Sequence, residues 1–241
     1  MTHPVPAALA SFAVELSPPR DEIVREMDAR AAETDFPTVG PAVGTWFRLL
    51  ADLVDASQIF EFGSGFGYSA YWFARALPAD GEVVLTEVDA DELATAREYF
   101  ERAGLADRAR FEHGDALETV ESYDGPFDVV LVDNEKDRYV EAFDAVRDRI
   151  APGGLVLADN ALTAGSTVEF EGVRALLGSG DDGGAGPPGT SPDGAEKDGR
   201  WTEGTRGIAD YLAHVRAADG FRTTLLPLGE GVAVSYRVPA S

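Results

Sequence analysis

Short apolar runs alternate with helix-length amphipathic segments through the middle of the chain, and this alternation constrains the fold more than any other feature. The apolar runs cover residues 59–62, 82–88, 109–112, 127–132 and 155–158. The segments expected to be helical between them cover residues 68–77, 91–103 and 136–150. Strands that alternate with helices of this length form βαβ units. The pattern therefore predicts an α/β fold with a largely parallel sheet and helices on both faces.

The remaining segments predict a layout around that sheet. Residues 1–20 are expected to be loosely ordered, and two helices should follow, one starting after Asp21 and one over residues 41–55. The second helix carries a stripe of apolar side chains expected in the core: Val43, Trp46, Phe47, Leu50, Leu53 and Val54. A last helix (205–218) precedes two runs, 222–227 and 232–238, that predict an antiparallel hairpin.

The chain of 241 residues is interpreted as an N-terminal extension, residues 1–35, that covers a domain of residues 36–241. Within that domain, residues 178–199 are rich in Gly, Pro, Asp and Ser and lack apolar periodicity, which predicts a mobile insert.

The net charge and the absence of cysteine indicate the cellular environment in which the protein works. There are 43 acidic and 20 basic residues, a net charge of −23, and the acidic residues are spread along the chain. Such a surface with two lysines favours a halophile's salty cytoplasm, where screening reduces self-repulsion; the alternative is a mesophilic protein that repels nucleic acid and anionic membranes. Without cysteine there is no disulfide or thiolate site, and without a long apolar run no membrane span is expected. A cytoplasmic location is the expectation.

A glycine-rich loop between the first strand and its helix predicts a ligand site. It is the segment Gly63-Ser64-Gly65-Phe66-Gly67, whose glycines permit sharp turns and close approach to a ligand, although a tight turn alone also explains them. Glu87 ends the next strand, where a carboxylate can accept from both ribose hydroxyls. Asp115, after the third strand, could reach an adenine amino group, or simply cap a helix. Together they favour a nucleoside-containing cofactor.

Oxygen-bearing side chains end the fourth and fifth strands. Asp133 follows the fourth, and Asp159 and Asn160 follow the fifth. If those strands are neighbours, their ends lie about 5 Å apart, and two carboxylates and an amide oxygen converge into a site suited to Mg²⁺. The alternative is a helix cap at Asp133 and a turn at Asp159-Asn160.

Lys136 lies one helical turn beyond Asp133, in a chain whose other basic residues, apart from Lys197, are arginines. A lysine can lose its proton beside another cation, whereas an arginine cannot. Lys136 is therefore a candidate for proton transfer, once a nearby metal lowers its pKa from the ordinary value near 10.4.

These residues resemble the metal-dependent class I O-methyltransferases of the catechol and caffeoyl-coenzyme A type, which use S-adenosylmethionine. The similarity runs from about Thr38 to Gly165 and resumes at residues 226–231. The matching segments are residues 60–69, 86–89, 113–116, 133–137, 152–154 and 159–160. The glycine loop is shared by many methyltransferases, whereas the combination of Asp133, Lys136, Asp159 and Asn160 is far more selective.

The resemblance implies a Rossmann-like class I methyltransferase fold, with a mostly parallel seven-stranded sheet ending in an antiparallel hairpin. It implies that Asp133, Asp159 and Asn160 hold Mg²⁺ or another divalent cation and that Lys136 is catalytic. The implied S-adenosylmethionine site consists of Val39, Glu61, Gly63, Ser64, Gly67, Ser69, Glu87, Val88, Asp115, Ala116 and Asp133.

The function implied is methyl transfer to a hydroxyl of a small catechol-like or vicinal-diol acceptor. Two alternatives stay open: methylation of a hydroxylated transfer-RNA nucleoside, and binding of S-adenosylmethionine or S-adenosylhomocysteine without turnover. The negative charge and the lack of a basic cluster with interleaved aromatics argue against nucleic acid. Relatives of the caffeoyl type suggest a homodimer. The chain departs from the family at Asn134-Glu135, at the insert and in its first 35 residues, so the resemblance does not specify the acceptor.

Overall fold

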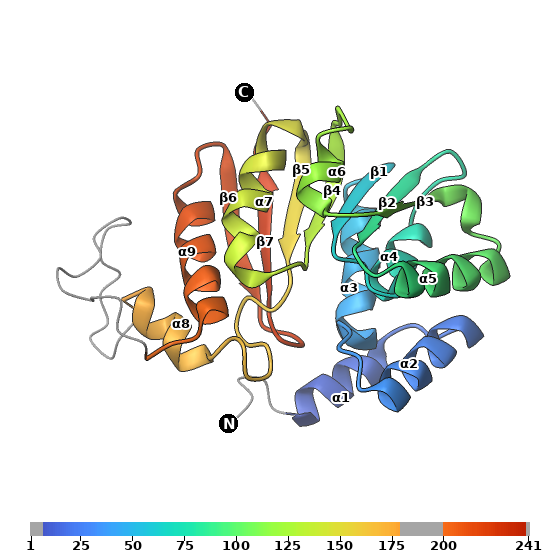
Figure 1. Ribbon diagram of the computed structural model, residues 1–241, viewed down its shortest axis with the longest axis horizontal. Helices are drawn as coiled ribbons and strands as arrows, with labels where there is room; N and C mark the ends of the chain where they lie inside the picture. The colour runs from blue at the N-terminus through green and yellow to red at the C-terminus, as the bar shows by residue number, and fades with distance from the viewer. Residues whose placement is uncertain (1–6, 179–199, 240–241) are drawn as a thin grey trace.

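The computed structural model describes residues 7–178 and 200–239, and its centre is a mixed sheet covered on both faces by helices (Figure 1). The strands are β1 (Gln58–Phe62), β2 (Glu82–Glu87), β3 (Ala109–His113), β4 (Phe127–Val132), β5 (Ile150–Ala158), β6 (Phe221–Leu226) and β7 (Val232–Arg237). The helices are α1 (Ala7–Leu16), α2 (Glu22–Thr34), α3 (Gly40–Leu53), α4 (Tyr68–Ala74), α5 (Ala90–Ala103), α6 (Ala116–Val120), α7 (Tyr139–Val146), α8 (Phe170–Leu176) and α9 (Glu203–Ala217).

The sheet has seven strands in the order β3-β2-β1-β4-β5-β7-β6. Strands β1 to β5 are parallel, and β7 runs antiparallel to both β5 and β6. The strand order reverses between β1 and β4, where parallel sheets of this kind open a crevice at their carboxyl edge. The predicted fold class, including the terminal hairpin, is confirmed.

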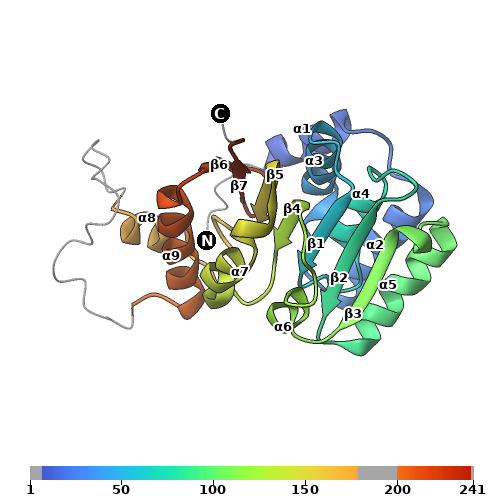
Figure 2. The same ribbon diagram turned by 90° about the horizontal axis from the view of Figure 1, so that it is seen from above.

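Successive strand residues serve two separate cores. Ile59 belongs to the core beneath α3, α4 and α5, whereas its neighbour Phe60 belongs to the core beneath α6, α7 and α9 (Figure 2). Because both faces are covered, the central strands are apolar without alternation, as in the run of residues 127–132. This double burial holds the carboxyl ends of the strands in fixed positions.

Two expectations about the N-terminal region are wrong. Residues 7–16, expected to be loosely ordered, form α1, an Ala-rich segment of high helix propensity that packs on α3. Trp46 and Leu53, expected in the core, are 39% and 68% exposed. The buried face of α3 follows the spacing Val43, Phe47 and Ala51, so the apolar stripe is wider than the surface that the sheet covers.

The predicted helix over residues 136–150 is shorter and irregular at both ends. One 3₁₀ turn covers Lys136–Arg138 before α7, another covers Arg147–Arg149 after it, and β5 begins at Ile150 rather than at residue 155. At Gly207 of α9, a Cβ atom would collide with the carbonyl oxygen of Lys136. Helix α9 therefore packs directly on the backbone that carries Lys136.

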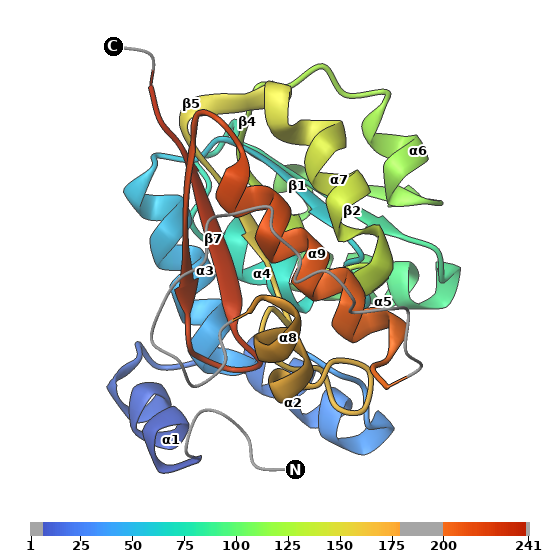
Figure 3. The same cartoon turned by 90° about the vertical axis from the view of Figure 1, so that its left-hand side faces the viewer.

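Helix α8, which the sequence pattern did not predict, packs beside α9 (Figure 3). The predicted insert, with Lys197, lies outside the described residues except for Gly178. In the two described ranges, no helix has the length and apolar character needed to cross a bilayer.

Candidate active site

Two adjoining pockets open at the carboxyl edge of the parallel strands, where the strand order reverses. One has a volume of about 320 Å³ and lies over β2, β3 and β4, and the other has about 550 Å³ and extends over β5. Gly63, Glu87 and Asp133 line both pockets. The two pockets are therefore halves of one site, centred on the ends of β1 and β4.

The glycine loop after β1 requires its first glycine for close packing. Gly63 has a φ of 78°, and a Cβ atom there would lie 2.6 Å from the carbonyl oxygen of Asp133. The loop can therefore approach the end of β4 only with glycine at this position. Gly67 has a different role: it precedes α4 and packs against Ala96 of α5, and it does not line either pocket.

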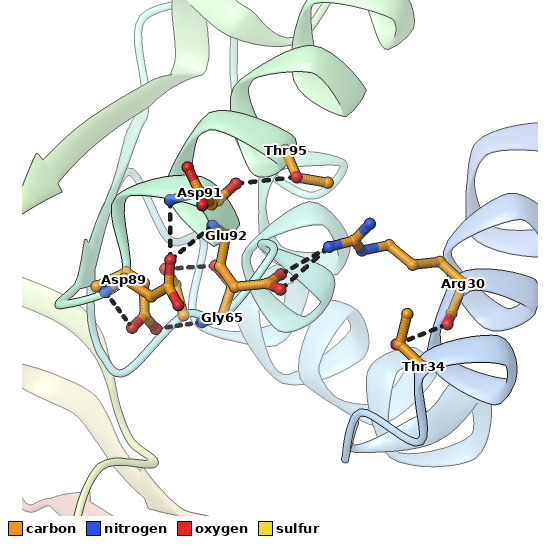
Figure 4. A network of polar contacts seen from close by, with 9 residues as sticks. Arg30, Thr34, Gly65, Asp89, Asp91, Glu92 and Thr95 are labelled. Carbon is orange, nitrogen blue, oxygen red and sulfur yellow. Dashed lines mark hydrogen bonds and ion pairs between the residues drawn. The ribbon is translucent and has the colours of Figure 1, made fainter.

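Glu87 connects the glycine loop to α5. Its carboxylate accepts hydrogen bonds from the backbone N–H of Gly65 at 2.7 Å and of Asp89 at 2.9 Å. Asp89 then caps α5 by accepting from the N–H groups of Asp91 and Glu92 (Figure 4). This network fixes the Glu87 carboxylate at the junction of the two pockets.

The smaller pocket has an apolar floor beside polar groups. Val88 is 66% exposed and lines it, together with Ala116 and Asp115. Asp115 caps α6 through Leu117 N–H at 2.8 Å and also pairs with Arg138 at 2.6 Å. The hydrogen bond from Arg138 holds the pKa of Asp115 below its ordinary value. An exposed valine beside fixed carboxylates suits the apolar face and polar edge of a purine.

Glu61 lies behind the glycine loop and not in a pocket wall. It is fully buried, and the hydroxyl of Ser69 donates to its Oε1, whereas its Oε2 has no partner. Burial raises the pKa of Glu61 to about 8. Glu61 can therefore support the pocket through Ser69, which does line the larger pocket.

The predicted metal ligands are brought together by the pairing of β4 with β5. Val132 is paired with Ala158 in the sheet. Asp133 and Asp159 each follow one of these paired residues, so the two aspartates lie at matching positions on neighbouring strands. Asp133, Asp159 and Asn160 all line the larger pocket. Asn160 has a φ of 56°, a left-handed conformation that asparagine tolerates better than most residues. The turn at Asp159-Asn160, which the sequence offers as the alternative interpretation, is present, and the same residues also line the pocket with Asp133.

Lys136 lies against this cluster. Its Nζ donates to Asp133 Oδ1 at 2.9 Å, to the Tyr139 hydroxyl at 2.8 Å and to the Asn134 carbonyl at 3.1 Å. The Tyr139 hydroxyl also lies 3.2 Å from the Asp159 carbonyl oxygen, to which it donates. All three ammonium protons are therefore engaged, and the lysine is held between the ends of β4 and β5.

The two carboxylates carry raised pKa values. Burial raises the pKa of Asp159 well above its ordinary value, and the nearby charge of Asp133 raises it further. Burial also raises the pKa of Asp133, although the Lys136 ammonium opposes that effect. Asp159 Oδ1 is buried without a hydrogen-bond partner. A cation between the carboxylates would compensate both the repulsion and the missing partner.

The donor set fits a hard divalent cation. Within residues 7–178 and 200–239, no group of three or more His, Cys, Asp and Glu has metal-binding spacing. The set here has two carboxylates and one carboxamide, all oxygen donors, as Mg²⁺ prefers. Such a set leaves coordination positions for water or for an acceptor.

Two loops face each other across the larger pocket. One is residues 36–39, between α2 and α3, which includes Val39, and the other is residues 164–167, after β5. Phe36 packs on the glycine loop, since a Cβ at Gly65 would lie 2.7 Å from its ring, and Arg30 of α2 pairs with Glu92 at 3.0 Å. Residues 36–39, which follow the predicted N-terminal extension, thus form part of the wall.

Sequence reasoning missed three residues of the site: Tyr139, Arg138 and Glu230. Tyr139 and Arg138 are in the segment that carries Lys136. Neither the hydroxyl of Tyr139 nor the charge of Arg138 indicates, from the sequence, which residue it contacts. Glu230 lies in the segment 226–231, which the sequence marks only through the family resemblance. Its carboxylate accepts from Asn160 Nδ2 at 2.5 Å. That contact spans 70 residues, so spacing alone could not indicate it.

Fold and site together define a Rossmann-like protein of the methyltransferase type, with a pocket over β2 and β3 beside a cluster of oxygen-bearing side chains. The sequence profile of the O-methyltransferase family matches residues 14–176. The chain belongs to this O-methyltransferase family.

Comparison with known proteins agrees with this assignment. The chain is 36% identical over 144 residues to the catechol O-methyltransferase of Niastella koreensis, covering 57% of this chain and 65% of that protein. It is 33% identical over 131 residues to caffeoyl-CoA O-methyltransferase 3 of Nicotiana tabacum, covering 52% and 54%. The chain thus spans between about half and two thirds of the curated relatives it matches.

Solved structures confirm the fold over nearly the whole chain. Cofactor-bound Rv0187 from MTB superposes with a TM-score of 0.76 at 23% identity, covering 99% of this chain and all of that one. The O-methyltransferase from Bacillus cereus in complex with SAH superposes with a TM-score of 0.75 at 24% identity, covering 95% and 97%.

Proposed function

We propose that this chain is an S-adenosylmethionine-dependent O-methyltransferase that uses a divalent cation, Mg²⁺ above all, to methylate a hydroxyl of a small catechol-like or vicinal-diol acceptor. The observation that carries the proposal is the convergence of Asp133, Asp159, Asn160 and Lys136 in a pocket that shares its wall with Glu87. The family membership and the relatives named for catechol and caffeoyl-CoA support it.

The smaller pocket and the glycine loop would bind the donor. Glu87, already oriented by Gly65 and Asp89, would accept from the ribose hydroxyls. Val88 and Ala116 would contact the adenine, with Asp115 and Arg138 at its edge. Ser64, Ser69 and Val39 line the larger pocket, where the methionine portion would extend toward the acceptor.

Asp133, Asp159 and Asn160 would hold the cation, which when bound lowers the cost of ionising the acceptor hydroxyl. The hydroxyl oxygen attacks the sulfonium methyl carbon in line, the carbon–sulfur bond breaks, and S-adenosylhomocysteine leaves. Lys136 Nζ would receive the hydroxyl proton as a neutral amine, after one of its three ammonium protons has passed to solvent. The residues that line the pocket would hold the acceptor with one oxygen directed at the methyl group, and positioning of this kind contributes about 7 kcal/mol or more in favourable cases.

The charge of the larger pocket favours a neutral or cationic acceptor. Of the described residues that line it, Lys136 is the single cation, against the carboxylates of Glu87, Asp133, Asp159 and Glu230. A polyphosphate or RNA backbone would meet repulsion there. This argues for a small diol over a transfer-RNA nucleoside.

A labelled-methyl assay tests the proposal. Purified protein with methyl-labelled S-adenosylmethionine and a panel of catechols should give methylated product with Mg²⁺ and none with EDTA, and Asp159→Ala should be inactive. Bulk transfer RNA in the same assay tests the nucleoside alternative. Tight S-adenosylhomocysteine binding without transfer to any acceptor in cell extract would instead support the binding-only alternative.

The homodimer remains part of this proposal. Size-exclusion chromatography with light scattering should give a mass of twice 25.6 kDa; a mass of one chain would contradict it.

A further inference from the structure

The turn between β6 and β7 is joined to the segment that follows β5. The carbonyl of Glu230 accepts from the N–H groups of Leu162 at 3.0 Å and Thr163 at 3.1 Å, and the carbonyl of Gly231 accepts from Ala161 at 2.8 Å. Gly231 has a φ of 88°, and a Cβ there would lie 2.5 Å from Leu162 Cγ. The backbones of the two segments are therefore in direct contact, and the carboxylate of Glu230 lies beside the oxygen cluster.

That carboxylate binds both ends of the segment. Its Oε2 accepts from Asn160 Nδ2 at 2.5 Å, and its Oε1 accepts from the N–H of Gly165 at 3.3 Å. A carboxylate only accepts hydrogen bonds, so the atom of Asn160 that faces it must be the NH₂ group. The carboxamide oxygen of Asn160 is then turned away from Glu230. Asn160 lines the larger pocket together with Asp159 and Asp133.

We propose that Glu230 is a positioning residue: it orients the Asn160 carboxamide so that Oδ1 serves the cation site, and it holds the segment 160–165 that continues into the acceptor-pocket wall at residues 164–167. The inference rests on the proposed function for the identity of the cation. The orientation itself depends only on the two hydrogen bonds.

A glutamine cannot replace Glu230 in this role. Both partners of the side chain are donors, Asn160 Nδ2 and Gly165 N–H, and a carboxamide offers one acceptor atom and one donor atom. Glu230→Gln therefore leaves one donor opposed by another, or lets the Asn160 amide rotate by half a turn. Glu230→Asp keeps both acceptors on a shorter stem and should recover part of the effect.

The composition of the chain allows a direct measurement of this orientation. It contains only three side-chain carboxamides, those of Gln58, Asn134 and Asn160. In a ¹⁵N-correlated NMR spectrum of the full chain, Asn160→Asp identifies the Asn160 NH₂ pair. In the wild type, the charged carboxylate of Glu230 should shift the resonances of this NH₂ pair, and its protons should exchange slowly with water. In Glu230→Ala and Glu230→Gln, the chemical shifts of the Asn160 pair should move toward those of an exposed carboxamide, while the shifts of the Gln58 pair stay unchanged.

Cation binding supplies the second measurement. Mn²⁺ titrated calorimetrically into the full chain should bind about 10- to 100-fold more weakly to Glu230→Gln and Glu230→Ala, the range typical for loss of a residue that orients a metal ligand. Glu230→Asp should lie between these variants and the wild type. Asp137→Asn removes one exposed carboxylate next to Lys136 and is the charge control. The measurement is repeated in 1 M KCl, where screening over about 3 Å suppresses a purely electrostatic loss.

The outcomes separate the inference from the proposed function. An unchanged Asn160 pair in Glu230→Gln, or a loss of Mn²⁺ affinity that disappears in 1 M KCl or equals that of Asp137→Asn, overturns the positioning role while the methyltransferase proposal stands. A wild-type chain that binds neither Mn²⁺ nor S-adenosylhomocysteine overturns the proposed function. Thermal unfolding of each variant shows whether it is folded, and the Gln58 pair reports on the sheet directly.

Discussion

The ammonium of Lys136 lies 2.9 Å from the carboxylate of Asp133, so the candidate base and a candidate metal ligand form one ion pair. Both side chains are largely buried, with 16% and 24% of their surface exposed, and Tyr139 holds the lysine from the other side. A cation held by Asp133 and Asp159 would be a close neighbour of the Lys136 ammonium. The candidate base and the candidate metal ligands therefore form one cluster.

Substitution of Lys136 should separate charge from proton transfer. Lys136→Arg keeps the positive charge but cannot release a proton, and Lys136→Met removes both. Both variants should lose about 10²- to 10⁴-fold in kcat, the range for loss of a general base. Calorimetry should find cation binding retained in Lys136→Arg. Near-normal turnover by Lys136→Arg would contradict the base assignment but not the proposed reaction.

Asp159→Asn should make the chain more stable in EDTA while abolishing activity. The pKa of Asp159 is raised in the folded protein, so an unfolded chain ionises this group more readily and stability falls as the pH rises above about 4. The neutral amide removes that cost, and a gain of about 0.5–2 kcal/mol in the free energy of unfolding is expected at pH 7. Urea denaturation measures it. Exposed Asp137→Asn should show no gain, and a destabilised Asp159→Asn would refute the prediction.

Glu61→Gln should change how stability depends on pH. The pKa of Glu61 is about 8 when folded, against 4.5 ordinarily, because the group is buried. Between these two pH values the carboxyl is ionised in the unfolded chain and stays protonated in the folded chain. The free energy of unfolding therefore falls as the pH rises, by up to about 1.4 kcal/mol per pH unit. Below pH 4.5 and above pH 8 its contribution is constant. The denaturation midpoints at pH 5 and pH 8 should therefore differ less for Glu61→Gln than for the wild type. If the midpoint changes by the same amount in both proteins, the raised pKa of Glu61 is contradicted.

Gly63→Ala should destabilise the chain and weaken donor binding. The new methyl group would combine a φ of 78° with a contact of 2.6 Å to the Asp133 carbonyl, at a cost of about 1–3 kcal/mol or more. Gly40→Ala is the matched control, because Gly40 has a φ of 71° but no atom within 4 Å of the added Cβ. Thermal unfolding and S-adenosylhomocysteine calorimetry compare the two. Similar losses in both variants would assign the effect to backbone strain alone.

Salt should stabilise this chain. Its net charge of −23 opposes the compact state, and raising KCl from 0.1 M to 1 M shortens the screening length from about 10 Å to about 3 Å. The midpoint of thermal unfolding should rise by several degrees, whereas an uncharged osmolyte at equal osmolarity, which does not screen charge, should have a smaller effect. A midpoint that is flat or falls with KCl would exclude the predicted adaptation to high salt.

The strands and the candidate ligands could be predicted because each depends on local pattern and general topology. Apolar runs such as residues 127–132 mark buried strands, and parallel strands place their carboxyl ends at one edge, which unites Asp133 with Asp159. The contacts of Glu230 and Arg138 could not be predicted, because they depend on where distant turns are placed. Trp46 was misassigned because apolar character does not tell which part of a wide stripe the sheet covers.

The pairing of Val132 with Ala158 has a consequence for insertions and deletions. Side chains alternate between the faces of a sheet, so a slip of one residue in β5 would carry Asp159 past Asp133 and turn it toward the opposite helical layer. A chain with one residue deleted from β5 could still collapse around its hydrophobic layers and yet be unable to chelate. The relative position of the two carboxylates therefore depends on the alignment of β4 and β5 to within a single residue.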